Sequence, residues 1–452
     1  MSSSDFATDG ALGVLSTNIN PFVTPGVIRP TASPTTASTN LVGNLVASSD
    51  DSQTVLPSTR IGVGSSGVIF SWDDSTWTQQ ITALSNTYSF PETDIAPFYA
   101  HNYVTSTTKL MQVNTSAWTK TENFQSLQDG SALHPLLVYQ ASLFVGDGKH
   151  LANLQSDEST WNADSSWVLN GNEKIVALGI DPTTGLMMVS VENAYNPGDS
   201  IQQPGIVYLY DGVSSKPIRK IIVDDLITSF QNVEGTVFVG TGSGMIGQWN
   251  GNGVTFLRKL MTNGTFLKAD LPYKHHMTNL RNILLIVDGL NILAYGAVVA
   301  GKRGFFYIAS NTINSNNIGM LMRAGSNKIG LGMATSQFET FDIGGTGNTT
   351  LANLYFNNIY FPRPIYVHRM RLITTGIAHT GNTDLYINIF DEKDNPLPIA
   401  SANRIFSAPT GTTYVKDFDF GGAKCQGIQP VLAISNNNYG IVRVIIYYDV
   451  AE

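Results

Sequence analysis

The sequence predicts an all-β protein, and three observations support this prediction. Short apolar runs alternate with Gly, Asn, Asp and Ser, as expected for strands joined by tight turns. Segments with helical periodicity and helix caps are nearly absent. Glycine accounts for 42 of the 452 residues, which favours a chain with many turns.

Composition excludes several classes of protein. Charged residues make up 13% of the chain, against roughly 25% in soluble domains, and the formal net charge is −8. General nucleic-acid binding needs a surplus of Lys and Arg to neutralise phosphates, so it is excluded. A single cysteine, Cys425, excludes an intrachain disulfide framework. No apolar run approaches the roughly 18 residues of a membrane span. Because the chain begins MSSSDFATDG, we expect no secretory signal and synthesis in a reducing cytoplasm.

Residues 1–54 are predicted to form an extended arm. They are rich in Ser, Thr, Pro and Asn, and prolines at 21, 25, 30 and 34 exclude a helix or a central strand. Hydrophobic residues nevertheless recur through the segment, more often than a solvated tail needs. We therefore expect the arm to lie on another subunit or on its own body, and to contribute to association rather than to core stability. A disordered leader is the alternative.

A pattern of about forty residues repeats through residues 55–345. Each copy has an apolar strand, a Gly-rich turn, a second strand ending in an apolar residue, and then usually Asp or Asn. Clear copies begin at Ile61 and Val237. The last apolar residue of the second strand marks the register of the repeat. These seven repeat anchors are Trp72, Val113, Leu154, Tyr210, Trp249, Tyr295 and Phe341.

This period is typical of the four-stranded blade of a β-propeller. A blade buries its two faces only against its neighbours, so the ring has to close. The sequence therefore predicts a β-propeller of seven blades over residues 55–345, with Trp72 and Trp249 as buried anchors between blades. Six or eight blades remain open, as do an irregular β-solenoid and an array of sandwiches.

Residues 346–452 carry strands of another kind. The segments DLYINIFD and YGIVRVIIYYDV alternate in period two and are longer than the strands of the repeat. Such strands over about a hundred residues predict a β-sandwich or jelly roll. Apolar residues on both faces of the last strand suggest one face on the core and the other on a partner or on the propeller.

Candidate chemistry is sparse. Neighbours on a strand point to opposite faces, so His275 and His276 are not expected to share a metal, and we expect them to be solvated loop residues. Cys425 is expected to be an inert thiol. The glycine-rich Val239–Gly244 leads into a strand, so it predicts a hairpin turn and not a phosphate cradle. The sequence therefore predicts no catalytic, cofactor-binding or metal site and no enzyme activity.

Segment Ser71–Trp77 resembles the Asp-box of sialidase-type propellers, in which an Asp carboxylate accepts turn amides. Here the box is one residue short and carries Ser75 in place of the usual Gly. The resemblance implies that Asp73 is structural. Trp72-Asp73 and Trp249-Asn250 are also similar to WD-repeat blades, but the Gly-His dipeptide of that family is absent.

The combination of a Ser/Thr/Pro-rich arm, a divergent propeller, few charges, one cysteine and an appended sandwich resembles virion proteins of tailed bacteriophages. That resemblance implies a structural tail, baseplate or fibre component that binds other virion proteins in several copies, with host attachment as an added role. It also implies location in the virion. The alternatives are a glycan-binding surface adhesin and, less favoured, a propeller glycosidase.

Overall fold

A computed structural model describes most of the chain. The described residues are 19–20, 29–30, 34–38, 41, 43–49, 60–82, 84–130, 132–165, 167–193, 204–260, 273–299, 302–310, 318–333, 337–343, 352–355, 359–376, 385–393, 395–398, 405–406, 414–434 and 439–451. The chain divides into two compact units. The ring unit comprises residues 35–290 and 313–340, and the C-terminal unit comprises 1–34, 291–312 and 341–452.

Within the described residues, seven sheets have four strands each. The first sheet consists of β4 (Leu45–Ser48), β5 (Arg60–Gly64), β6 (Val68–Trp72) and β7 (Trp77–Ile81), and the second of β8 (Ile95–Phe98), β9 (His101–Thr105), β10 (Lys109–Asn114) and β11 (Thr119–Ser126). The third consists of β12 (Leu136–Tyr139), β13 (Ser142–Asp147), β14 (His150–Leu154) and β15 (Trp161–Asn162), the fourth of β16 (Glu173–Ile180), β17 (Met187–Asn193), β18 (Gly205–Tyr210) and β19 (Arg219–Val223), and the fifth of β20 (Ile227–Val233), β21 (Thr236–Thr241), β22 (Met245–Trp249) and β23 (Val254–Lys259). The sixth consists of β24 (Met277–Leu280), β25 (Ile283–Asp288), β26 (Asn291–Val299) and β27 (Lys302–Ser310), and the last of β28 (Ile318–Arg323), β29 (Lys328–Met333), β30 (Phe338–Asp342) and β3 (Thr35–Ser38).

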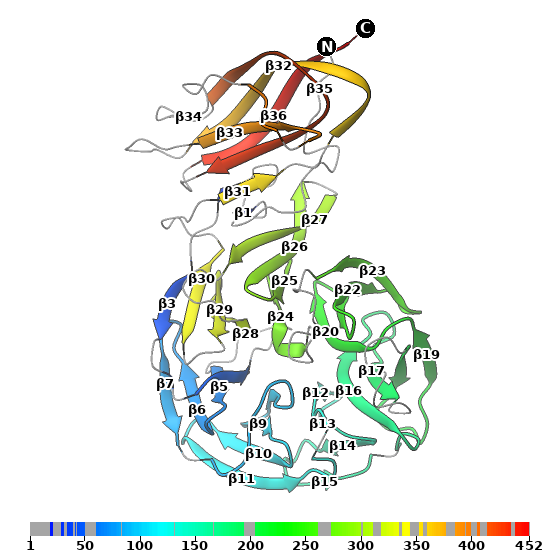
Figure 1. Cartoon of the computed structure of the whole chain (residues 1–452). Helices are drawn as coiled ribbons and strands as arrows, with labels where there is room; N and C mark the ends of the chain where they lie inside the picture. The colour runs from blue at the N-terminus through cyan, green and yellow to red at the C-terminus, as the bar shows by residue number, and fades with distance from the viewer. Residues whose placement is uncertain are drawn as a thin grey trace. The chain divides into compact units, whose positions relative to one another are not determined.

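The sheets of the ring unit are arranged in a ring (Figure 1). Successive sheets share buried apolar clusters, as blades must if neither face is to meet water. Between the first and second sheets, for example, Ile61 and Val63 pack with Val104 and Met111. The predicted fold class, an all-β protein with a β-propeller, is confirmed. The seven sheets equal in number the repeats found in the sequence.

The ring is closed by a strand from the N-terminal region. β3 pairs antiparallel with β30, with Thr35 opposite Thr340 and Ser38 opposite Phe338. At the same seam, Leu45 of β4 is buried in the cluster that contains Phe338. The last sheet is therefore completed by residues that precede the first sheet in sequence.

This seam changes the description of residues 1–54. The predicted arm contains β3 and β4, which are strands of the ring, and all four residues of β4 are buried. Two short strands of the remainder, β1 (Ile19–Asn20) and β2 (Arg29–Pro30), pair with each other. β1 lies against β27 and β31 (Ala352–Tyr355), within the C-terminal unit. The expectation that the whole arm serves association alone is therefore wrong for β3 and β4.

The C-terminal strands form one six-stranded sheet. Its members are β31, β32 (Ile359–Gly376), β33 (Leu385–Asp391), β34 (Ile405–Phe406), β35 (Tyr414–Ile434) and β36 (Tyr439–Val450). β35 pairs with β32 along most of its length and with β33 at its end. Between the two halves of β35, Gly421 and Gly422 adopt φ of 62° and 75°, which glycine reaches without strain.

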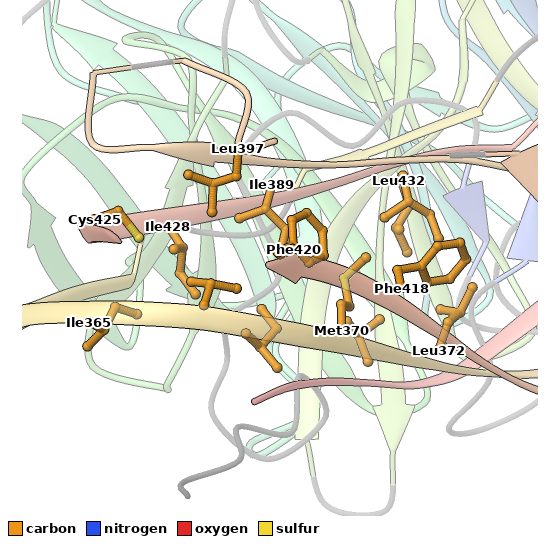
Figure 2. Close-up of a cluster of buried hydrophobic side chains, with 14 residues drawn as sticks. Ile365, Met370, Leu372, Ile389, Leu397, Phe418, Phe420, Cys425, Ile428 and Leu432 are labelled. Carbon is orange, nitrogen blue, oxygen red and sulfur yellow. The ribbon is translucent and has the colours of Figure 1, made fainter. Parts of the chain in front are cut away.

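Both halves of this sheet share one core. Phe418 and Phe420 come from the first half of β35, and Ile428 and Leu432 come from the second. Figure 2 shows these side chains gathered with Met370 of β32 in a single apolar layer. The assignment of residues 346–452 to a β-sandwich stays a prediction, because the structure has one sheet whose two long strands serve both halves.

Candidate functional site

The candidate site lies at the central channel of the ring unit. A cavity of about 260 Å³ is lined by the first strands of successive sheets, β8, β12, β16, β20, β24 and β28. Each of these strands has only one hydrogen-bonded neighbour in its sheet, so its other edge faces the channel. Lys274 and His275, in the turn before β24, also line the cavity.

Asp94 holds three parts of the ring together beside this cavity. Its carboxylate accepts hydrogen bonds from the backbone N–H of Ile95 at 2.7 Å and of Leu136 at 2.8 Å. It also accepts one from Lys274 Nζ at 2.8 Å, and Lys274 donates a further bond to the Leu136 carbonyl at 3.1 Å. His275 Nε2 lies 3.2 Å from the other carboxylate oxygen. The second, third and sixth sheets are thereby linked through one buried carboxylate.

The electrostatics of this cluster follow from its geometry. Burial by itself raises the pKa of Asp94, but the Lys274 ammonium and the nearby His275 outweigh burial and hold that pKa well below its usual range. Asp94 is therefore an ionised structural group at neutral pH. A carboxylate that accepts three hydrogen bonds and also faces the His275 ring is a poor general base, because most of its lone pairs are already occupied.

The two adjacent histidines differ from the sequence expectation. Both are buried, in a 3₁₀ turn at Lys274–His276, and neither is a solvated loop residue. His276 stacks on Phe90 with ring centroids 4.4 Å apart, and its Nε2 lies 3.1 Å from the Gly319 carbonyl. The two imidazole groups contact different residues, His275 beside Asp94 and His276 beside Phe90, so they do not converge on one point.

The repeat anchors all lie on the third strand of a four-stranded sheet. Trp72 packs against Trp77 of its own sheet and Phe338 of the last sheet, at centroid distances of 5.3 and 4.9 Å. It also donates from Nε1 to the Ala324 carbonyl at 2.9 Å. Trp249 packs with residues of the fourth sheet. Tyr295 is half-buried, and the other anchors are buried: Val113, Leu154, Tyr210 and Phe341. They mark the packing layer between sheets and do not form a binding site.

The acidic residues that follow the anchors form turns. Asp73 accepts the backbone N–H groups of Ser75 at 2.9 Å and Thr76 at 2.7 Å. These amides and the Ser75 hydroxyl lower the pKa of Asp73 to about 2. Asp157 and Asp211 accept turn amides in the same way. The prediction that Asp73 is a turn-former is confirmed.

Two other expectations concern Cys425 and Val239–Gly244. Cys425 is buried in the core of the C-terminal sheet, and burial raises the pKa of its thiol to about 11, so the reactive thiolate is scarce at neutral pH. Residues Thr241–Gly244 make the hairpin turn between β21 and β22, with a hydrogen bond from Gly244 N–H to the Thr241 carbonyl at 3.0 Å.

Sequence reasoning missed the Asp94 cluster. Asp94 and Lys274 are 180 positions apart, and neither stands in a motif. Across the described ranges, no group of three or more His, Cys, Asp or Glu side chains is placed to hold a metal ion. In the same ranges no helix has the length and apolar character of a membrane span.

No family model matches the chain, and no curated protein matches its sequence. Among solved structures, the chain is similar to a computationally designed protein, Ika8, with 11% identity and a TM-score of 0.42 over 67% of this chain and 98% of that one. It is similar to the WD40 β-propeller domain of Doa1, with 12% identity and a TM-score of 0.46 over 68% and 97%. It is also similar to the extracellular domain of a putative hybrid two-component system from B. thetaiotaomicron, with 12% identity and a TM-score of 0.48 over 75% of this chain and 43% of that one.

Proposed function

We propose that the protein is a non-enzymatic structural component of a bacteriophage tail or tail-associated complex, in which the ring is a rigid platform that binds other virion proteins. The observation that carries this proposal is the Asp94 cluster. Its charges are used to fix the positions of strands from three sheets, and the acids after the anchors are used in turns. These polar groups serve rigidity, and a rigid surface loses little conformational entropy when it binds a partner.

The composition of the chain supports a protein partner. Asn, Ser and Thr supply most of the polar side chains in a chain that is only 13% charged. Such groups form neutral and water-mediated hydrogen bonds, which are common between subunits. The net charge of −8 disfavours retention of DNA passing through an assembly.

The proposal is tested by locating the chain in the native particle. Labelled protein imaged by electron microscopy is expected at one fixed position in the tail with a constant copy number. Exclusion of the labelled protein from purified particles would contradict the virion assignment. A screen of the purified protein for glycosidase and esterase turnover tests the proposal that the protein is not an enzyme. Turnover that disappears on mutation of one acidic residue would establish an enzyme.

The channel mouth offers a sharper variant of this test. Val138 lines the channel cavity and is 41% exposed, while Val168 lies outside that lining and is 40% exposed. Val138→Trp is expected to reduce incorporation into particles if partners dock at the cavity, while Val168→Trp leaves it unchanged. Equal incorporation of both variants would show that the platform uses another face.

A further inference from the structure

The outer face of the C-terminal sheet carries a compact group of cationic, aromatic and aliphatic side chains. Along β32 and β36, one set of alternate residues is buried in the core, including Met370, Leu372, Val444 and Ile446. The other set forms the outer strip, which is defined here as Arg369, Arg371, Ile373, Asp417, Ile445 and Tyr447.

Arg371 is held in place by a bidentate pair. It donates from Nε to Asp417 Oδ1 at 2.7 Å and from its terminal nitrogen to Oδ2 at 2.9 Å. Bonding to this guanidinium lowers the pKa of Asp417 and raises the pKa of Arg371, so both groups are charged at any physiological pH. The planar fork of Arg matches a carboxylate in this geometry.

Arg369 is placed differently. Its guanidinium carbon lies 4.5 Å from the centroid of the Tyr447 ring, which is its register partner on β36. Its one hydrogen bond within the described residues goes to the same Asp417, at 3.4 Å. The side chain is 41% exposed. Stacking on Tyr447 therefore orients Arg369. Because a guanidinium has five N–H donors, most of the donors of Arg369 remain available.

Two guanidinium groups therefore share one carboxylate. Asp419, the register partner of Arg369, accepts the N–H of Gly421 at 2.9 Å. Arg443, the register partner of Ile373 on β36, is exposed on the same face. Three guanidinium groups therefore lie beside two carboxylates, which makes this face locally cationic in a chain whose net charge is −8. A ligand that complements it brings a carboxylate, which Arg369 can bind through two parallel hydrogen bonds.

We propose that the outer strip docks an acidic surface of a partner protein, with Arg369 binding a partner carboxylate. The flanking side chains favour a protein over a glycan. Ile373 and Ile445 are half-buried aliphatic residues beside the cations, and Val415 of β35 is 49% exposed. Arg and Tyr next to aliphatic residues are the composition of binding hot spots between proteins. The ring of Tyr447 is already covered by a guanidinium, whereas a sugar needs an open aromatic face.

The proposal is tested with defined probes and the full chain. A hexaglutamate peptide represents the acidic protein surface and hexagalacturonate represents an acidic glycan, each titrated calorimetrically at low salt. Arg369→Ala is compared with Arg369→Lys and with the control Lys424→Ala. Lys424 is another cation over an aromatic ring, 5.7 Å from the centroid of Tyr366, so its removal changes the net charge equally. Thermal melting of each variant checks that the fold is intact.

We expect hexaglutamate to bind the native protein and Arg369→Ala to weaken binding on the order of tenfold, as for a hydrogen bond to a charged group. Arg369→Lys is expected to fall between them because an ammonium lacks the planar fork. Lys424→Ala is expected to stay within about twofold. Equal losses in Arg369→Ala and Lys424→Ala would reduce the effect to net charge and overturn the proposal. Tighter binding of hexagalacturonate than of hexaglutamate would also overturn it, in favour of a glycan.

Discussion

The ring unit and the C-terminal sheet bury their strands in different ways. A ring sheet has four short strands and packs each face against a neighbouring sheet, as Trp72 does between its own sheet and Phe338. The C-terminal sheet has strands of 18 and 21 residues, which pack one face on a single core. Its other face carries Arg369 and Arg371. Closure of the ring gives every blade a neighbour on each face. A sheet that packs only one face on a core leaves its other face exposed to water or to a partner.

The comparison teaches where stability and binding reside. In the ring, each sheet depends on its neighbours, so damage at the closing seam is expected to spread through the unit. In the C-terminal sheet, core residues and outer residues alternate along the same strand, so the outer strip can be changed without opening the core. The following predictions test this difference.

The largest effect is expected from two nested deletions. Removal of residues 1–48 takes away β3 and β4, which pair with β30 and β5, and leaves the closing seam incomplete. We expect loss of most of the ring's stability, which is on the order of 5–15 kcal/mol for a domain. The control is a variant that lacks only residues 1–34, in which β3 and β4 remain. Calorimetry measures the unfolding transition of both variants. Similar ring transitions in the two deletions would show that β3 and β4 are dispensable.

Core truncations in the two regions are expected to act separately. Trp72→Ala should cost about 3–5 kcal/mol in the ring, as for large aromatic truncations in cores. Phe418→Ala should cost a similar amount in the C-terminal sheet, where Phe418 is fully buried. Denaturant unfolding followed by probes in each unit measures both. A cost below about 0.5 kcal/mol for Trp72→Ala, typical of exposed sites, would show that the repeat register is wrong.

A buried carboxyl at the seam should make the ring sensitive to pH. Glu339, on β30 opposite Thr36, is fully buried, and neither carboxyl oxygen has a hydrogen-bond partner among the described residues. Burial raises its pKa above the usual 4.5. The unfolded state therefore releases this proton first, and stability falls as pH rises from about 4.5 through the raised value. Glu339→Gln should melt higher at pH 7, with the gain vanishing near pH 4. An unchanged gain across this range would rule out titration of Glu339.

The smallest effect is expected at the turns. Asp73→Ala removes the acceptor for Ser75 and Thr76 and should cost below about 1 kcal/mol, because the site is exposed and screened. Since the pKa of Asp73 is lowered from 3.8 to about 2, its contribution is present above pH 4 and is lost as pH falls toward 2. Asp391→Ala makes the matched change in the C-terminal sheet. NMR titration of Asp73 checks the pKa, and a midpoint near 3.8 would contradict the turn bonds.

The sequence by itself determined the repeating part of this protein. The anchors from Trp72 to Phe341 recur once per blade because each blade packs an apolar residue of its third strand against its neighbours. The turn role of Asp73 was also predictable, because its partners lie two and three residues away.

Only the tertiary structure decided the features that join distant segments. The N-terminal boundary was misplaced because β3 resembles a Ser/Thr-rich tail until it pairs with β30. Thr35 and its partner Thr340 are 305 positions apart in sequence. Asp94, Lys274 and His275 meet only when the ring closes around the channel. Arg369 and Tyr447 become neighbours only through the register of β32 with β36. Local patterns record the interactions of a residue with its sequence neighbours, whereas ring closure and strand register depend on the balance of energies over the whole chain.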